Sequence, residues 1–320
     1  MPDTYFTSSP HWTVFIVPYF FIGGIAGGCY FLATVLSWLG NEGDEEVARL
    51  GYLAAFVGVV VSGLLLIVDL GQPLRFWHML LQAQRFPLPM LKAWSPMSIG
   101  SWALFFFGMF ATLSAAGVLA HSGRLRFRPA AMLYTGLPGR VISFIGAAFG
   151  FFIAGYTGVL LSVTNRPIWA DTTWLGVLFL VSSASKAAAT LILLARWQMN
   201  VGAEHPTVRW LAWFDGWVLV AELLLLVIFV ASLGEVARVW LSWRGLVLFV
   251  FVVLLGILIP LAMHFRPGWV TGSWRGRPAL TGAVLVLVGG FFLRLVTILG
   301  SETIHAPHTG IPNPITGMWP

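Results

Sequence analysis

Eight stretches of this chain are each long and apolar enough to cross a lipid bilayer. A spanning helix needs roughly 20 mostly apolar residues to cross about 30 Å of hydrocarbon. The stretches cover residues 13–39, 48–69, 96–120, 139–163, 173–195, 212–233, 244–264 and 279–300. Membrane β-barrels show instead alternating strands of about ten residues. We therefore predict an all-α integral membrane protein with eight transmembrane helices.

The composition supports this class and excludes others. Of the 320 residues, 58% are hydrophobic and only 9% are charged, whereas an ordinary soluble domain carries about 25% charged residues. A soluble globular enzyme, a disordered chain and a coiled coil are therefore excluded. The net charge of +6 reflects basic residues that flank spans, so we expect no nucleic-acid partner.

The cysteine and histidine content limits the cofactors. Cys29 is the single cysteine, so the chain cannot house a structural zinc or an iron–sulfur cluster by itself. A bis-histidine haem needs two facing imidazoles at one depth, and none of the seven histidines lies in mid-span. We expect no haem, with a shallow site at His78 or His264 left open.

Basic residues in the loops predict the orientation. An even number of spans places both termini on one side. Ten loop Lys and Arg residues fall on the opposite side from the termini and six on the same side, so the positive-inside rule favours termini on the outer, periplasmic side. The first stretch lacks a basic leader and a cleavage site, which argues against a signal peptide.

Polar residues inside spans are candidate functional residues, because burying them in hydrocarbon is costly. In this orientation several lie in the outer leaflet or at its edge: Tyr19, Asp69, Tyr156, Asn165, Arg166 and Arg294. Together these side chains suit a quinone head group, which needs hydrogen-bond donors for its two carbonyls and a group that exchanges protons. The alternative interpretation is structural: Asp69 pairs with Arg75 or Arg166 and only ties loops together.

Two further charged residues lie deeper. Lys186 and Glu222 fall near the bilayer midplane on the fifth and sixth spans. An unpaired charge at that depth would be neutralised, so pairing is the expected solution. The pair is interpreted either as a structural ion pair or as a step of a proton path.

The longest loop, at about residues 70–95, is rich in Pro, Trp and basic residues. It faces outward in this orientation and could dock a soluble partner. An aromatic belt with snorkelling arginines is the structural alternative.

Four motifs in order resemble the NrfD family of polysulfide-reductase-type membrane subunits. They are Gly23-Gly24-Ile25-Ala26-Gly27-Gly28, Asp69-Leu70-Gly71-Gln72-Pro73-Leu74-Arg75-Phe76-Trp77, Ser95-Pro96-Met97-Ser98-Ile99-Gly100-Ser101-Trp102, and Tyr156-Thr157-Gly158-Val159-Leu160-Leu161 with Thr164-Asn165-Arg166-Pro167. They cover most of residues 15–175, and the eight-span count agrees along the whole chain.

The resemblance implies a haem-free subunit of the bacterial cytoplasmic (inner) membrane, built as two four-helix bundles over residues 1–165 and 166–320. The N-terminal bundle would bind menaquinone or ubiquinone near the outer face. A four-cluster ferredoxin-like iron–sulfur subunit would dock there and connect to a molybdopterin catalytic subunit. Tyr156 looks like the quinone-contacting tyrosine, and Tyr19 occupies a place where some relatives carry a histidine.

Two functions from different classes follow. The leading hypothesis is a quinol or quinone oxidoreductase subunit, with Tyr156 and Tyr19 at the carbonyls and Asp69 and His78 exchanging protons. Arg166, beside Asn165, would stabilise the reduced head group. The alternative is a proton channel or secondary transporter lined by Lys186, Glu222 and Arg294; a hybrid would couple quinone chemistry to proton translocation. The terminal substrate and the direction of electron flow are not encoded in this chain.

Overall fold

The structure is a computed structural model that describes residues 15–126, 128–202, 204–265 and 278–301. Eight helical segments within these residues are long and apolar enough to span a membrane, which confirms the predicted all-α, eight-span fold. An isolated antiparallel bridge joins Leu81 and Pro89. The start of the first predicted span, three of the inward arginines (Arg266, Arg275, Arg277) and the C-terminal tail lie outside the described residues.

The spans follow one another with short connections. They are α1 (Ile16–Leu39), α2 (Glu45–Asp69), α3 (Pro96–His121), α4 (Gly136–Ser162), α5 (Leu175–Met199), α6 (Pro206–Ser232), a seventh composite span, and α9 (Pro278–Gly300). Short 3₁₀ segments lie between them: η1 (Glu42–Asp44), η2 (Pro73–Met79), η3 (Arg128–Leu133) and η4 (Gly234–Leu241). Most ends agree with the predicted spans to within a few residues.

Local sequence explains several helix ends. Pro96 occupies the first turn of α3, and the Ser95 side chain caps that turn by accepting from the Ser98 amide, as helix starts favour. Pro206 likewise begins α6, six residues earlier than the predicted start at 212. The polar residues Thr207 and Arg209 precede the apolar run there, so hydropathy alone placed this start too late.

The seventh span changes its winding along its length. It consists of α7 (Trp243–Val247), a π-helical segment η5 (Leu248–Leu258) and α8 (Ile259–Phe265). Pro260 has no N–H to donate to the carbonyl one turn before it, and the wide winding precedes this proline directly. Such π segments are uncommon, and they often mark functional regions.

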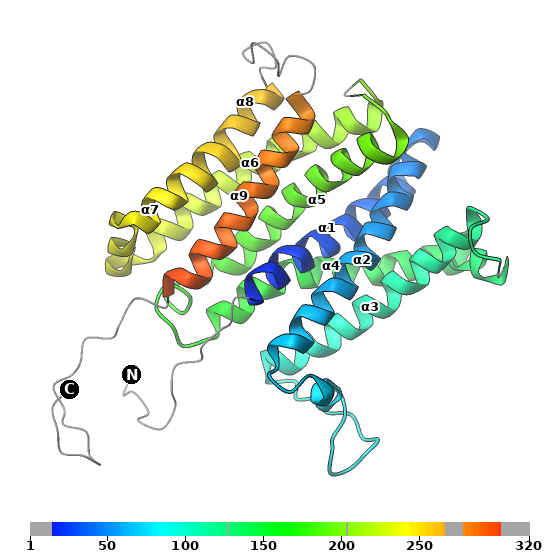
Figure 1. Cartoon of the computed structure of the whole chain (residues 1–320), viewed down its shortest axis with the longest axis horizontal. Helices are drawn as coiled ribbons and strands as arrows, with labels where there is room; N and C mark the ends of the chain where they lie inside the picture. The colour runs from blue at the N-terminus through cyan, green and yellow to red at the C-terminus, as the bar shows by residue number, and fades with distance from the viewer. Residues whose placement is uncertain (1–14, 127, 203, 266–277, 302–320) are drawn as a thin grey trace.

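Helix α1 lies at the centre of the molecule. It contacts α2 and α4 on one side and α5 and α9 on the other. Figure 1 shows α2, α3 and α4 on one side of α1, with α5 to α9 gathered on the other. We call the end of the bundle where α1 begins and α9 ends the terminal face, and the end with the α1–α2, α3–α4 and α5–α6 connections the opposite face.

Glycines allow α1 to approach its neighbours at backbone distance. A Cβ added at Gly27 would overlap the carbonyl oxygen of Gly150 on α4. A Cβ at Gly28 would lie 2.7 Å from the Ala187 Cβ and 2.8 Å from the Ser183 carbonyl oxygen on α5. Small residues serve this purpose in membrane helix packing. The motif of the first span therefore fixes α1 between the two groups of helices.

Candidate functional site

Tyr19 and Tyr156 lie near the terminal face, on α1 and α4. Tyr19 is three residues from the start of α1 and Tyr156 six residues from the end of α4, about 5 Å and 9 Å along the helices. Both are buried, with exposed fractions of 4% and 7%. The structure thus places both tyrosines inside the helix bundle at similar depth, as the sequence predicts.

The Tyr156 side chain is held across α3. Its hydroxyl donates a 2.7 Å hydrogen bond to the carbonyl oxygen of Pro96, and its ring stacks on Phe152 with centroids 5.4 Å apart. A Cβ at Gly100 would overlap the phenol, so this position must be glycine for the ring to lie here. The phenolic oxygen keeps lone pairs that can accept a hydrogen bond from a ligand.

Asp69 and His78 lie at the edge of this region. Asp69 is the last residue of α2 and is half-buried. His78 lies in η2, where its ring meets that of Trp77 at 3.9 Å. Figure 1 shows the segment between α2 and α3 projecting beyond the helix ends. The structure therefore places His78 on a projecting loop, without showing it in contact with the tyrosine pair.

Arg166 follows α4 and faces towards the C-terminal helices, while Asn165 before it is exposed. The guanidinium of Arg166 lies 5.4 Å from the centroid of the Trp169 ring, a cation–π arrangement. The Trp169 indole donates to the Thr297 carbonyl oxygen on α9 at 2.8 Å. This connection therefore joins the α4–α5 loop to the last span.

Several buried donors without partners among the described residues lie towards the terminal face. Ser62 Oγ, Thr157 Oγ1, and Nε and Nη1 of Arg166 have no hydrogen-bond partner within the described residues. A Cβ at Gly23 would lie 3.5 Å from Ser62 Oγ and 4.0 Å from the Tyr19 ring, so Ser62 lies beside Tyr19. Buried polar groups are normally partnered. These donors fit a ligand that brings its own acceptor oxygens.

Arg294 on α9 is fully buried and well bonded. Its guanidinium donates to Ser182 Oγ at 2.6 Å, Ser183 Oγ at 3.2 Å, the Phe179 carbonyl oxygen at 3.1 Å and the Gly290 carbonyl oxygen at 3.2 Å. It also lies 4.6 Å from the Phe179 ring centroid. Arg294 is thus a fixed charge that ties α9 to α5.

Lys186 and Glu222 do not form the expected ion pair. Lys186 Nζ has no hydrogen-bond partner among the described residues and lies 5.2 Å from the Phe21 ring centroid on α1. Its stem runs past Gly290, where a Cβ would overlap it. Glu222 interacts electrostatically with both Arg294 and Lys186. The three residues therefore share one buried cluster, but the lysine points towards α1.

Asp215 and His264 extend this cluster towards the opposite face; Asp215 was not predicted from the sequence, and His264 was named there only for a shallow haem site. Asp215 is fully buried on α6, and its carboxylate accepts from Ser185 Oγ at 2.5 Å and lies 2.9 Å from His264 Nε2. Asp215 and Glu222 are two turns apart on one helix face, and this spacing could have revealed them. No three His, Cys, Asp or Glu in the described part of the chain could hold a metal ion.

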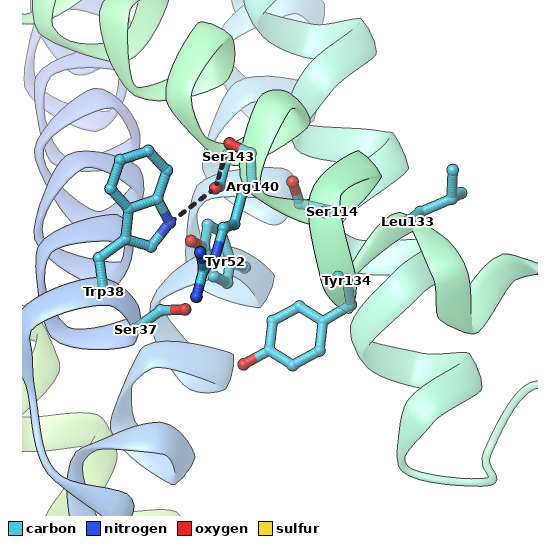
Figure 2. A pocket seen from close by; sticks show the side chains of 10 residues that line it. Ser37, Trp38, Tyr52, Ser114, Leu133, Tyr134, Arg140 and Ser143 are labelled. Carbon is cyan, nitrogen blue, oxygen red and sulfur yellow. Dashed lines mark hydrogen bonds between the residues drawn. The ribbon is translucent and has the colours of Figure 1, made fainter.

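The N-terminal helices enclose a small polar cavity at the opposite face. It has a volume of about 90 Å³, and Ser37, Trp38, Tyr52, Arg140 and Ser143 are among its lining residues. Figure 2 shows the Trp38 indole directed at Ser143, to which it donates at 3.1 Å. The volume corresponds to roughly three water molecules.

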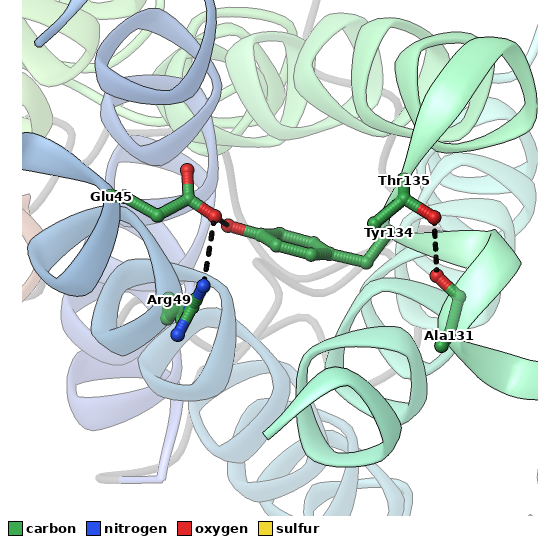
Figure 3. Close-up of polar contacts among 5 residues, drawn as sticks. All are labelled: Glu45, Arg49, Ala131, Tyr134 and Thr135. Carbon is green, nitrogen blue, oxygen red and sulfur yellow. Dashed lines mark hydrogen bonds and ion pairs between the residues drawn. The ribbon is translucent and has the colours of Figure 1, made fainter. Parts of the chain in front are cut away.

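A carboxylate anchors the rim of this cavity. Glu45 Oε1 accepts from the Tyr134 hydroxyl at 2.6 Å and from Arg49 at 3.3 Å, as Figure 3 shows. Tyr134 lies in the α3–α4 connection. Burial and then its hydrogen bond to Glu45 raise the pKa of the Tyr134 phenol above its usual value. The contact joins the start of α2 to that connection.

The comparisons with known proteins agree with this architecture. The family model described as "Polysulphide reductase, NrfD" matches residues 5–306. One of the chains of the polysulfide reductase of Wolinella succinogenes is 27% identical over 94% of this sequence and 96% of its own length. A protein NrfD homolog of Haemophilus influenzae is 29% identical over 81% of this sequence and 85% of its own.

A shorter similarity extends to another reductase. One of the subunits of the selenate reductase of Mesobacillus selenatarsenatis is 30% identical over 112 residues, which are 35% of this sequence and 24% of that protein. The relatives named for a reaction are thus parts of reductases. Since the family model covers nearly the whole sequence, this chain is a multi-pass membrane protein that belongs to the NrfD family.

Proposed function

We propose that this chain is the quinone-exchanging membrane subunit of a multi-subunit oxidoreductase. The observation that carries the proposal is the burial of two phenols, Tyr19 and Tyr156, at similar depth near the terminal face. Donors on Ser62 and Thr157, which have no partner among the described residues, lie towards the same face. A quinone offers two acceptor oxygens to such donors, and its tail enters from the lipid.

Each residue has a specific role in this proposal. The Tyr156 proton is already engaged by Pro96, so its oxygen would accept from a quinol hydroxyl, which favours binding of the reduced form. Tyr19 would contact the other oxygen. Arg166, with Asn165 beside it, would stabilise negative charge on the head group, and Asp69 and His78 would pass protons to the adjacent aqueous phase.

The partners follow from what this chain lacks. It has one cysteine, so electrons must leave for a cluster on another subunit. We propose a four-cluster ferredoxin-like iron–sulfur subunit that docks at the terminal face and passes electrons to or from a molybdopterin subunit. The loop between α2 and α3 presents exposed apolar side chains there, among them Leu74 at 89% and Trp94 at 82%.

The proposal is tested by substituting the site in the intact complex. Tyr156→Phe removes the phenolic oxygen and is expected to lower kcat/KM for a quinol analogue by roughly tenfold, ~1.4 kcal/mol. Asp69→Asn should slow proton release. The matched control is Tyr30→Phe, because Tyr30 lies on α1 across Gly146 much as Tyr156 lies across Gly100. Unchanged turnover in both Tyr156→Phe and Asp69→Asn would reject this site.

A proton channel or secondary transporter is the second candidate. The observation in its favour is Lys186, a fully buried amine whose Nζ has no partner among the described residues. Lys186, Glu222 and Arg294 would line the path. Uptake or proton flux by the chain alone in liposomes would support this candidate, and co-purification of an iron–sulfur protein would support the first.

A further inference from the structure

The buried polar residues of α5, α6, α8 and α9 form one series between the two faces. Hydrogen bonds connect His264 to Asp215 at 2.9 Å and Asp215 to Ser185 at 2.5 Å. Ser182, one turn from Ser185, accepts from Arg294 and lies beside Glu222. The next charge along the series is Lys186.

This series ends beside the helix that carries Tyr19. Lys186 Nζ would lie 3.6 Å from a Cβ at Gly24 and faces the Phe21 ring. Gly24 is five residues beyond Tyr19 on α1, about 7.5 Å along the axis. Lys186 therefore presents its amine to α1, the helix that carries Tyr19.

The N-terminal helices offer no comparable series within the described residues. Their cavity leads inward to Tyr52, which donates to Thr34, and to Tyr30, whose hydroxyl pairs with Ser114 at 2.5 Å. Beyond Tyr30, α1 and α4 meet backbone to backbone at Gly27 and Gly150. The cavity of Figure 2 is lined as far inward as Tyr52 and Ser114, and this backbone contact is not part of its lining.

Two acidic side chains, Asp215 and Glu222, lie in this cluster with two basic ones, Lys186 and Arg294, so their formal charges cancel. The side chains of Asp215 and His264 are 0% and 5% exposed, and His264 is the penultimate residue of α8 at the opposite face. A proton that enters here is held between the imidazole and the carboxylate, which lie 2.9 Å apart, and it raises the net charge of the cluster by one.

We propose that the Asp215–His264 pair is the proton-loading site through which this cluster exchanges protons with the aqueous phase at the opposite face during quinone turnover. The groups facing the pair are Ser185 from α5 and Glu222 from α6, with Lys186 and Arg294 acting on Glu222. Quinol loses two electrons to the docked subunit and two protons; the loading site supplies a separate proton, which replaces one that Lys186 releases towards the terminal face. This inference rests on the proposed quinone function.

The test uses the intact complex in sealed vesicles of one orientation with a pH-sensitive dye on each side. His264→Gln and Asp215→Asn are expected to lower the protons taken up at the opposite face per electron at least twofold. Quinol oxidation in protonophore-treated vesicles should stay within twofold of wild type. The matched control is Glu45→Gln. Glu45 is a hydrogen-bonded carboxylate at the same face but in the N-terminal helices, and its substitution should leave the number of protons taken up per electron unchanged.

Two results would overturn the proposal. One is a wild-type ratio fully accounted for by protons exchanged at the terminal face. The other is a ratio in His264→Gln and Asp215→Asn equal to wild type. If those variants do not assemble, Ser185→Ala is used instead. It keeps every charge but removes the hydrogen bond from Ser185 to Asp215, and it must also lower the number of protons taken up per electron. Loss of uncoupled quinol oxidation in Tyr156→Phe decides the quinone site separately.

Discussion

At the scale of single residues, the depth of a side chain along its helix could be predicted from the sequence, but the direction in which it points could not. Tyr19 and Tyr156 were expected at similar depth, and the structure places both of them buried near the terminal face. Lys186 and Glu222 were expected to pair, yet the lysine points to Phe21. Rise per residue gives height along a helix, whereas rotation about its axis depends on packing. Asp215 was missed because its partner His264 lies on another span.

A residue-scale prediction concerns Tyr134. Burial and the Glu45 contact raise its pKa above 10.0, so above pH 10 the folded protein holds a proton that the unfolded chain releases. Its contribution to stability is present below that pH and is lost as the pH rises further. Thermal unfolding in detergent between pH 9 and 11 should show a shallower decline for Tyr134→Phe than for wild type; equal slopes would contradict this assignment.

At the scale of elements, hydropathy predicted the spans because each is a long apolar run. It placed the start of α6 late, since the polar residues Thr207 and Arg209 lie in the first turn of that helix, and it did not indicate the π winding of the seventh span. Both departures depend on polar or proline chemistry that an average over a window hides. The glycine motif of α1 did predict close approach, although not which helices approach.

An element-scale prediction tests that approach. Gly27→Ala places a methyl group against the Gly150 carbonyl, so α1 and α4 must separate, at a cost of about 1–3 kcal/mol. We expect a lower midpoint of thermal unfolding in detergent. Gly63→Ala on α2 is the control, because a Cβ there meets nothing within 4 Å. Equal midpoints for the two variants would refute close packing at Gly27.

At the scale of the whole molecule, the number of helices followed from the sequence, but their neighbours did not. The central position of α1, in contact with both groups of helices, depends on pairings between segments far apart in the chain. Hydrogen bonds between distant segments at the two faces add to these pairings. Trp169 bonds to Thr297 near the terminal face, and Asp44 bonds to Thr207 at the opposite face.

A whole-molecule prediction concerns the second of these hydrogen bonds. Thr207 is buried and donates to the Asp44 carboxylate at 2.5 Å, which links the α1–α2 turn to the start of α6. Thr207→Val keeps the shape and removes the donor, and we expect a loss of about 1 kcal/mol. Calorimetry of the purified protein measures it. Thr112→Val, whose hydroxyl is exposed and bonds within its own helix, should change stability less.

The backbone contacts on both flanks of α1 also restrict how the halves can communicate. A helix pressed against Gly150 on one flank and Ser183 on the other cannot roll or tilt without separating from one of these neighbours. Such close contacts oppose the rigid-body rocking on which alternating-access carriers rely. In the proposed quinone function, the effect of a bound quinone would then pass by rotamer changes of side chains such as Lys186, which take picoseconds to nanoseconds when unhindered rather than the microseconds to milliseconds of domain motion.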